Sequence, residues 1–153
     1  MDTYFDTAPS PLRVDPAARF AWTLPARLAG AALCAGVAAI HVVDQGGFPG
    51  SKSPGYLGVG YYLLELAAVV AAVVLVGRSA RTGWLLSMAV AAAPLLGFVL
   101  TRGPGLPSAT DDRGNWTEPV GLISLAVEAL LLALSAYMLF RASSKRPAHL
   151  TVE

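Results

Sequence analysis

The chain has 153 residues, of which 55% are hydrophobic and only 14% are charged, and its net charge is +1. Since a soluble domain has roughly 25% charged residues, this composition excludes a disordered tail, a coiled coil, a nucleic-acid arm and a typical cytosolic enzyme. A single cysteine, Cys34, excludes an internal disulfide framework and a CxxC motif. The remaining class is a polytopic membrane protein whose partner is the lipid bilayer, with no nucleic-acid partner.

Four apolar runs predict the helices of this membrane protein. Residues 1–25 precede them, carry four prolines among small polar residues, and predict a flexible cytoplasmic segment. A membrane crossing takes about 20 mainly apolar residues. The first run, Leu28–Val43, is shorter, so tilt or local thinning of the bilayer has to cover the difference. We expect helices over residues 27–44, 57–77, 82–101 and 119–141.

The predicted fold is all-α, a four-helix transmembrane bundle over residues 26–141, with a short basic cytoplasmic tail at 142–153. Eight of the eleven Lys and Arg residues lie in the N-terminal segment, the second connection and the C-terminal tail. Because basic residues stay in the cytoplasm, both termini are expected there. The alanine-rich composition suggests a bacterial source, and hence a multi-pass protein of the bacterial inner membrane.

Each predicted helix carries one stripe of small or polar residues, spaced three and four positions apart, so that the members share a face. Small residues let helices approach closely in lipid, and polar residues must find partners inside the bundle. We therefore expect the four stripes to face each other. Their members are Gly30, Cys34, Val37, His41 and Asp44; Gly58, Tyr61, Glu65, Ala68 and Ala72; Ser87, Ala91, Pro94, Phe98 and Arg102; and Gly121, Ser124, Glu128 and Ser135.

The ionisable members converge in the outer half of the bundle and predict an outward-facing polar pocket, whereas the inner half is expected to be plain apolar packing. The candidate ligand- or proton-binding residues are His41, Asp44, Tyr61, Glu65, Arg102 and Glu128. A carboxylate at mid-membrane costs about 2.5–3.5 kcal/mol on insertion scales, which favours a functional role. The alternative is a structural lock, in which Glu65 pairs with His41 and Glu128 pairs with Arg102.

The sequence does not decide which cofactor, if any, the pocket would bind. His41 with Glu65 and Glu128 could hold a metal, but the sequence has no HxxxH or ExxH motif and no second intramembrane histidine, so a metal or a haem is less favoured. A quinone is the preferred candidate: Tyr61, His41 and Arg102 would donate hydrogen bonds to it, and the two glutamates would take up protons or cations.

Two further patterns bear on this pocket. The segments GVGYYLLE (58–65) and GLISLAVE (121–128) both place Gly seven residues before Glu. This spacing is typical of a parallel internal repeat, with chance similarity between apolar helices as the alternative. The third connection carries Asp111, Asp112 and Glu118 and forms either a lid over the pocket or a compact linker.

The segment LLELAAVV, with Glu65, followed by the basic turn GRSARTGWLLSM, resembles the DoxX-like family of small four-helix bacterial membrane proteins. The resemblance covers about residues 26–141. It implies an association with membrane redox complexes and thiol-stress systems, some of them with quinone-linked oxidation. Only Glu65 and the Arg78–Arg81 turn of this sequence match residues of the family pattern. The long third connection and the proline-rich lead-in depart from the family pattern.

Three functions follow as hypotheses. The first is an accessory or small-ligand-binding subunit, redox-linked through a quinone, not an enzyme on its own, and part of a homo-oligomer or a membrane complex. The second is a proton-coupled transporter or cation-binding carrier, against which the charge-free inner half argues. The third is a scaffold or assembly factor whose polar residues only lock the helices.

Overall fold

The structure is a computed structural model that describes residues 16–77 and 79–143, and these form four helices with no strands. The helices are α1 (Pro16–Asp44), α2 (Gly55–Val76), α3 (Ala80–Arg102) and α4 (Pro119–Ser143). Each contains a segment long and apolar enough to cross a membrane: Leu24–Asp44, Gly55–Val76, Ala80–Arg102 and Pro119–Ala142. The prediction of an all-α fold with four helices of membrane-spanning length is thus confirmed for the described residues, and the ends of α2, α3 and α4 lie within two residues of those predicted.

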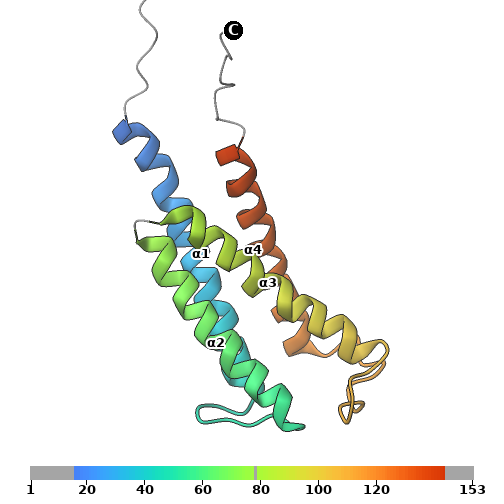
Figure 1. The fold of residues 1–153 in the computed structure, drawn as a ribbon. Helices are drawn as coiled ribbons and strands as arrows, with labels where there is room; N and C mark the ends of the chain where they lie inside the picture. The colour runs from blue at the N-terminus through green and yellow to red at the C-terminus, as the bar shows by residue number, and fades with distance from the viewer. Residues whose placement is uncertain (1–15, 78, 144–153) are drawn as a thin grey trace, which may run out of the picture.

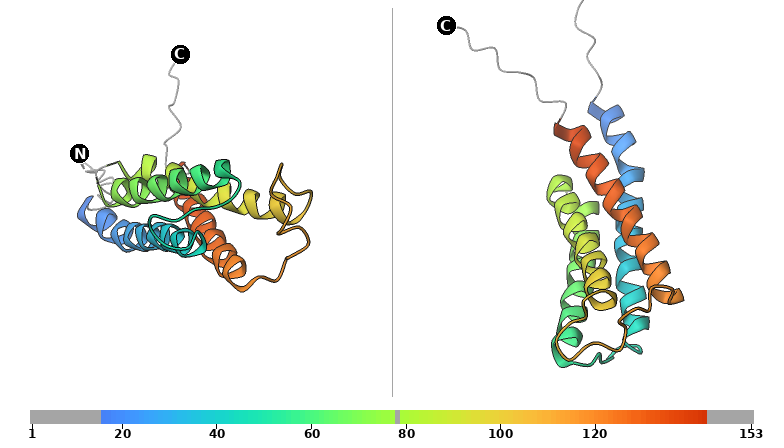
Figure 2. Two further views of the ribbon diagram at one scale, coloured as in Figure 1. Left: turned by 90° about the horizontal axis from the view of Figure 1, so that it is seen from below. Right: turned by 90° about the vertical axis from the view of Figure 1, so that its right-hand side faces the viewer.

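The helices run up and down as two hairpins, α1–α2 and α3–α4 (Figure 1). The most extensive packing is α1 against α2, followed by α3 against α4 and α2 against α3. Both long connections, residues 45–54 and 103–118, lie at one end, which we call the loop end (Figure 2). The start of α1, the end of α4 and the α2–α3 turn lie at the other end, the turn end.

Helix α1 begins at Pro16, whereas the sequence predicted its start near residue 27. The segment predicted to be flexible is therefore helical from residue 16 onward. A proline fits the first turn of a helix because its missing N–H has no intrahelical partner there. Pro25, inside α1, removes one backbone hydrogen bond without ending the helix. Residues 1–15 and most of the predicted basic tail, residues 144–153, lie outside the described residues.

The stripes of small and polar residues face the inside of the bundle, as predicted. Large apolar side chains point outward instead, among them Leu63, Leu66 and Val73 on α2, each more than 60% exposed. Such an arrangement is expected for helices surrounded by lipid, because lipid tails are as apolar as these side chains and exert no hydrophobic force to bury them. The buried members of the stripes are Gly30, Cys34, Val37, His41, Gly58, Glu65, Ala68, Ser87, Ala91, Glu128 and Ser135.

Close backbone approach holds the turn half of the bundle together. A Cβ added at Gly83 of α3 would lie 2.9 Å from both the Cα and the N of Leu75 on α2. One added at Gly30 of α1 would lie 2.7 Å from the ring of Trp84. Only glycine leaves room for these contacts. Leu75 and Trp84, the partners of these two glycines, belong to the apolar core. Its members are Cys34, Val37, Ala68, Ala71, Leu75, Trp84, Val90, Ala91 and Leu131.

Apolar packing alone was expected in this half, and that expectation is wrong at Arg27. The side chain is only 6% exposed and donates hydrogen bonds to the carbonyls of Leu75, Val76 and Gly77. These carbonyls belong to the C-terminal turn of α2, where no intrahelical donor remains for them. A cation also complements the negative end of the helix dipole. Arg27 thus ties α1 to the end of α2.

Candidate functional site

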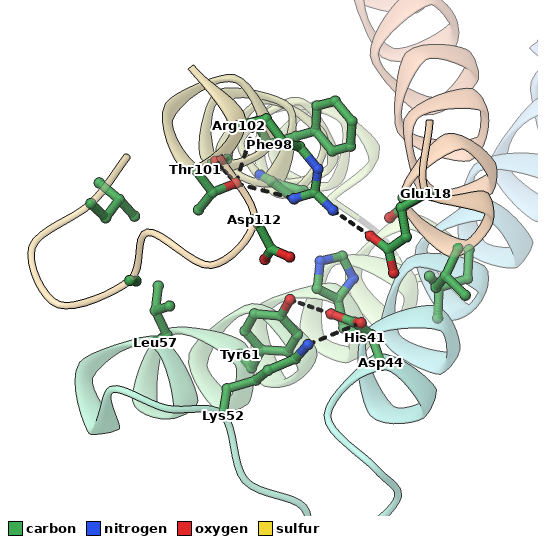
Figure 3. A pocket seen from close by; sticks show the side chains of 18 of the residues that line it. His41, Asp44, Lys52, Leu57, Tyr61, Phe98, Thr101, Arg102, Asp112 and Glu118 are labelled. Carbon is green, nitrogen blue, oxygen red and sulfur yellow. Dashed lines mark hydrogen bonds and ion pairs between the residues drawn. The ribbon is translucent and has the colours of Figure 1, made fainter. Parts of the chain in front are cut away.

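A cavity of about 350 Å³ lies between the two hairpins at the loop end (Figure 3). All four helices and both long connections contribute to its lining. Five of the six predicted site residues line it, namely His41, Asp44, Tyr61, Arg102 and Glu128. The sixth, Glu65, is buried but does not line the cavity, so the two glutamates do not share one space as predicted.

His41 of α1 and Glu128 of α4 are neighbours in the wall of the cavity. The Nδ1 atom of His41 lies 2.9 Å from the carbonyl oxygen of Val37. A carbonyl can only accept, so Nδ1 carries a proton in this contact, and Nε2 is an acceptor in the neutral ring. That Nε2 lies 4.0 Å from Oε1 of Glu128. The distance is within ion-pair range but too long for a hydrogen bond, so the two groups are neighbours without a direct bond.

Glu128 is the most deeply buried ionisable group of the site, at 1% exposed. Its Oε1 accepts a hydrogen bond of 2.6 Å from the hydroxyl of Ser124, one turn earlier on α4. The predicted partner, Arg102, does not reach it, so that pairing is wrong. Arg102 sits at the end of α3 and is engaged by groups of its own hairpin.

All three nitrogens of the Arg102 guanidinium have partners. Nη2 donates to Glu118, Nε donates to the carbonyl of Asn115 at 3.1 Å, and Nη1 donates to Thr101 Oγ1 at 3.1 Å. The guanidinium also lies over the ring of Phe98, 4.1 Å from the centroid, as a cation–π contact. Glu118 directly precedes α4, so this cluster joins the end of α3 to the start of α4.

Asp44 is the last residue of α1, as Arg102 is the last residue of α3, and it is the centre of a similar polar cluster in the other hairpin. It accepts a hydrogen bond from the hydroxyl of Tyr61 on α2, and Nζ of Lys52 lies 3.0 Å from its second oxygen. The Tyr61 ring also meets the His41 ring edge-on, with the centroids 5.1 Å apart. Sequence reasoning missed Lys52, because nothing in the pattern of the first connection indicates that it folds back onto Asp44.

Glu65 pairs with Gln45 and not with His41, so the second predicted pairing is also wrong. Nε2 of Gln45 donates to Oε1 of Glu65 at 2.8 Å, and both side chains are buried. Oε1 of Gln45 has no hydrogen-bond partner among the described residues. The bond from its own backbone N–H to the His41 carbonyl continues the helical turn. Gln45 lies four residues after His41 and therefore on the same face of the helix. This spacing could have identified Gln45 as a buried polar residue from the sequence.

The third connection contributes to the lining of the cavity, and its role as a lid or as a compact linker stays a prediction. Leu106, Ala109, Asp111 and Asp112 line the cavity, and Figure 3 shows the Asp112 carboxylate pointing into it. The hydroxyl of Tyr56 on α2 donates to the carbonyl of Pro107 at 2.7 Å, which fastens this connection to the other hairpin.

The lining is rich in acidic groups. It holds two permanent cations, Lys52 and Arg102, against five carboxylates, those of Asp44, Asp111, Asp112, Glu118 and Glu128. Each cation is already paired with a carboxylate of its own hairpin. The side chains of Asp111 and Asp112 form no hydrogen bond or ion pair within the part of the chain that the structure describes. The lining therefore has three more carboxylates than permanent cations, and two of these carboxylates, Asp111 and Asp112, are exposed.

Within residues 16–77 and 79–143, no group of three or more His, Cys, Asp and Glu side chains gathers closely enough to hold a metal ion. The set of His41, Glu65 and Glu128 is accordingly not brought together. Comparison with known proteins finds no matching family model, no matching curated protein and no matching solved structure.

Proposed function

We propose that this chain is a multi-pass protein of a cell membrane that binds a small polar ligand in the loop-end cavity. The four apolar helices are compatible with membrane insertion. The cavity volume of about 350 Å³ lies within the range of sites that enclose small molecules. We further propose that the protein acts as a binding or accessory subunit, with the loop end outside the cell.

The contrast between the two buried glutamates is the observation that carries this proposal. Glu65 lies outside the cavity and is bonded to Gln45 at 2.8 Å, as expected of a structural lock between α1 and α2. Glu128 lines the cavity and stands 4.0 Å from Nε2 of His41 with no direct bond. A lock would close this distance, because an unmade hydrogen bond at a buried group is costly. A ligand-binding site leaves it open.

Transport is the weaker alternative. Between the cavity and the Arg27 contact at the turn end lies a largely apolar core, in which Val37, Ala68, Ala71 and Leu131 are fully buried beside the hydroxyls of Ser87 and Ser135. A carrier needs polar groups or water along its route, because an ion in hydrocarbon is expensive. The lining is therefore better suited to binding from one side than to passage across the bundle.

The test is native mass spectrometry of the protein purified in mild detergent, which also counts the copies of the chain and any partner. We expect a small molecule to co-purify with the wild type and with Glu65→Gln, and to be lost from Glu128→Gln. The two substitutions are matched, since each removes one buried carboxylate and keeps its shape. The scaffold hypothesis predicts instead that no small molecule is retained and that Glu65→Gln and Glu128→Gln both lower stability.

A quinone, which the DoxX-like resemblance favours, is one ligand to look for in that spectrum. Its carbonyl oxygens would need hydrogen-bond donors from the cavity wall. Tyr61, His41 and Arg102 were expected to supply them. The Tyr61 hydroxyl and Nδ1 of His41 are engaged by Asp44 and Val37, and three of the five N–H groups of Arg102 are engaged by Glu118, Thr101 and Asn115. The geometry thus supports the binding of a small ligand more strongly than it supports this particular one.

A further inference from the structure

We propose that the ligand of the loop-end cavity is a small organic cation, whose N–H donors bridge Glu128 and His41. This inference rests on the proposed function and names its ligand class. It follows from which polar groups of the lining are already bonded, from the spacing of the two groups that are not bonded to each other, and from the charge of the lining.

Most donors of the lining are already engaged. Arg102 donates one hydrogen bond from each of its three nitrogens, which uses three of its five N–H groups, and the hydroxyl of Tyr61 donates to Asp44. The hydroxyls of Ser124 and Thr101 donate to Glu128 and to backbone carbonyls. Lys52 is paired with Asp44. A ligand that relies on accepting hydrogen bonds, such as an anion or a carbonyl compound, therefore finds mainly the remaining N–H groups of Arg102 and Lys52, two cations that carboxylates already hold.

The acceptors, in contrast, remain in surplus. Nε2 of His41 accepts no hydrogen bond within the described residues, although the side chain is nine-tenths buried, and the residue lines the cavity. One oxygen of Glu128 is bonded to Ser124, and its other oxygen is without a hydrogen bond in the described part of the chain. The carboxylate of Asp112 points into the same space (Figure 3). The acceptors of His41 and Glu128, two largely buried side chains that border the cavity, favour a ligand that donates, whereas Asp112 is exposed and contributes only its charge.

The spacing of the two groups fits such a donor. Charge-assisted N–H···O bonds are about 2.7–2.9 Å long. A nitrogen at about this distance from both Nε2 of His41 and Oε1 of Glu128 bridges the 4.0 Å between them, and Oε1 can accept this second bond beside the one from Ser124. In the neutral His41 ring Nε2 can accept, because the proton lies on Nδ1, toward Val37. An ammonium group supplies both donors and the positive charge that the lining lacks.

The charge of the ligand decides between the classes. Pairing each cation of the wall with its neighbour leaves Glu128, Asp111 and Asp112 without a permanent positive partner. An anion would be repelled by these three groups, and a neutral ligand would leave their charge unchanged. A cation is attracted to them and reduces the excess of negative charge.

The test is isothermal titration of the full-length protein in lipid nanodiscs, in an amine-free phosphate buffer. Three probes of nearly equal size are compared: benzylammonium, benzyl alcohol and benzoate. We expect benzylammonium to bind at least about tenfold more tightly than either of the others. Equal or tighter binding of the alcohol or of benzoate, or no binding of benzylammonium, would overturn the proposal.

Variants localise the effect. Glu128→Gln should weaken benzylammonium binding by about tenfold or more, since it removes the charge of a charge-assisted hydrogen bond. Glu65→Gln, a matched carboxylate outside the cavity, should leave binding unchanged. Asp112→Asn alters only an exposed loop and should weaken binding about threefold, as for a partly solvated charge pair. It tests the proposal even where Glu128→Gln does not fold, and unchanged affinity in Asp112→Asn would count against the proposal.

The outcome also separates this inference from the proposed function. If a neutral or anionic molecule binds in the cavity and depends on Glu128, the cavity is a ligand site and only the ligand class is wrong. If no probe binds and native mass spectrometry finds no retained molecule, both proposals fall.

Discussion

Gly83→Ala is the most direct test of how closely α2 and α3 pack. The added Cβ would lie 2.9 Å from the Cα and the N of Leu75, whereas ordinary van der Waals contact begins near 3.4 Å. The two backbones must therefore separate by about 0.5 Å, because these contact atoms, unlike a side-chain tip, cannot rotate away. A new methyl group at such a place costs about 1–3 kcal/mol.

Alanine has a higher helix propensity than glycine, and this difference offsets up to about 1 kcal/mol of the steric cost of the added methyl group. We expect a net loss of about 1–2 kcal/mol in the free energy of unfolding. Unfolding in mixed micelles with rising dodecyl sulfate, followed by tryptophan fluorescence, measures it, since Trp84 is buried at the same helix contact.

Gly60→Ala is the matched control, because a Cβ there meets nothing within 4 Å and the position is exposed. It should be neutral or stabilising by about 0.5–1 kcal/mol. The reasoning is refuted if Gly83→Ala is as stable as Gly60→Ala, since that would mean that the helices do not approach as closely as the structure indicates.

Three further predictions concern stability and orientation. Arg27→Met keeps the apolar stem but loses the bonds to the end of α2, and should lower the free energy of unfolding by about 2 kcal/mol; an unchanged value would mean that these bonds contribute nothing. A double-mutant cycle of Gln45→Ala and Glu65→Ala should give a coupling of about 1 kcal/mol in the same assay, and zero coupling would contradict the lock. A cysteine at Thr117→Cys should react with a membrane-impermeant maleimide in intact cells, with little background because Cys34 is fully buried. Labelling only in inverted vesicles would show that the loop end faces the cytoplasm.

Sequence reasoning predicted the faces of the helices well. Positions three and four apart share a face whatever the helix packs against, so the stripes through Cys34, Glu65, Ser87 and Glu128 could be assigned to the inside without a structure. Hydropathy and length likewise defined the helices, because a bilayer sets both. The start of α1 was missed, since four prolines among small polar residues in residues 1–25 led to the prediction of a flexible segment.

The pairing of polar groups was not predictable in the same way. Placing His41 on a face does not say whether its ring turns toward α2 or toward α4, and a bond to the Val37 carbonyl decides this. Arg102 has Glu118 within reach only because the third connection brings that residue back to the end of α3. Such contacts depend on loop conformation, which the periodicity of the helices does not encode.

The two hairpins share few polar contacts at the loop end. The Asp44 and Glu65 bonds join α1 and its connection to α2, whereas Arg102 bonds only within the other hairpin. Among the described residues, only two side-chain polar contacts cross the seam there: the bond from Tyr56 to Pro107 and the unclosed approach of His41 to Glu128. The polar bonds within each hairpin at the loop end therefore do not depend on the other hairpin. On our proposal, a ligand bound to both His41 and Glu128 adds a bridge across this seam, so we expect its binding to strengthen the association of the two hairpins there.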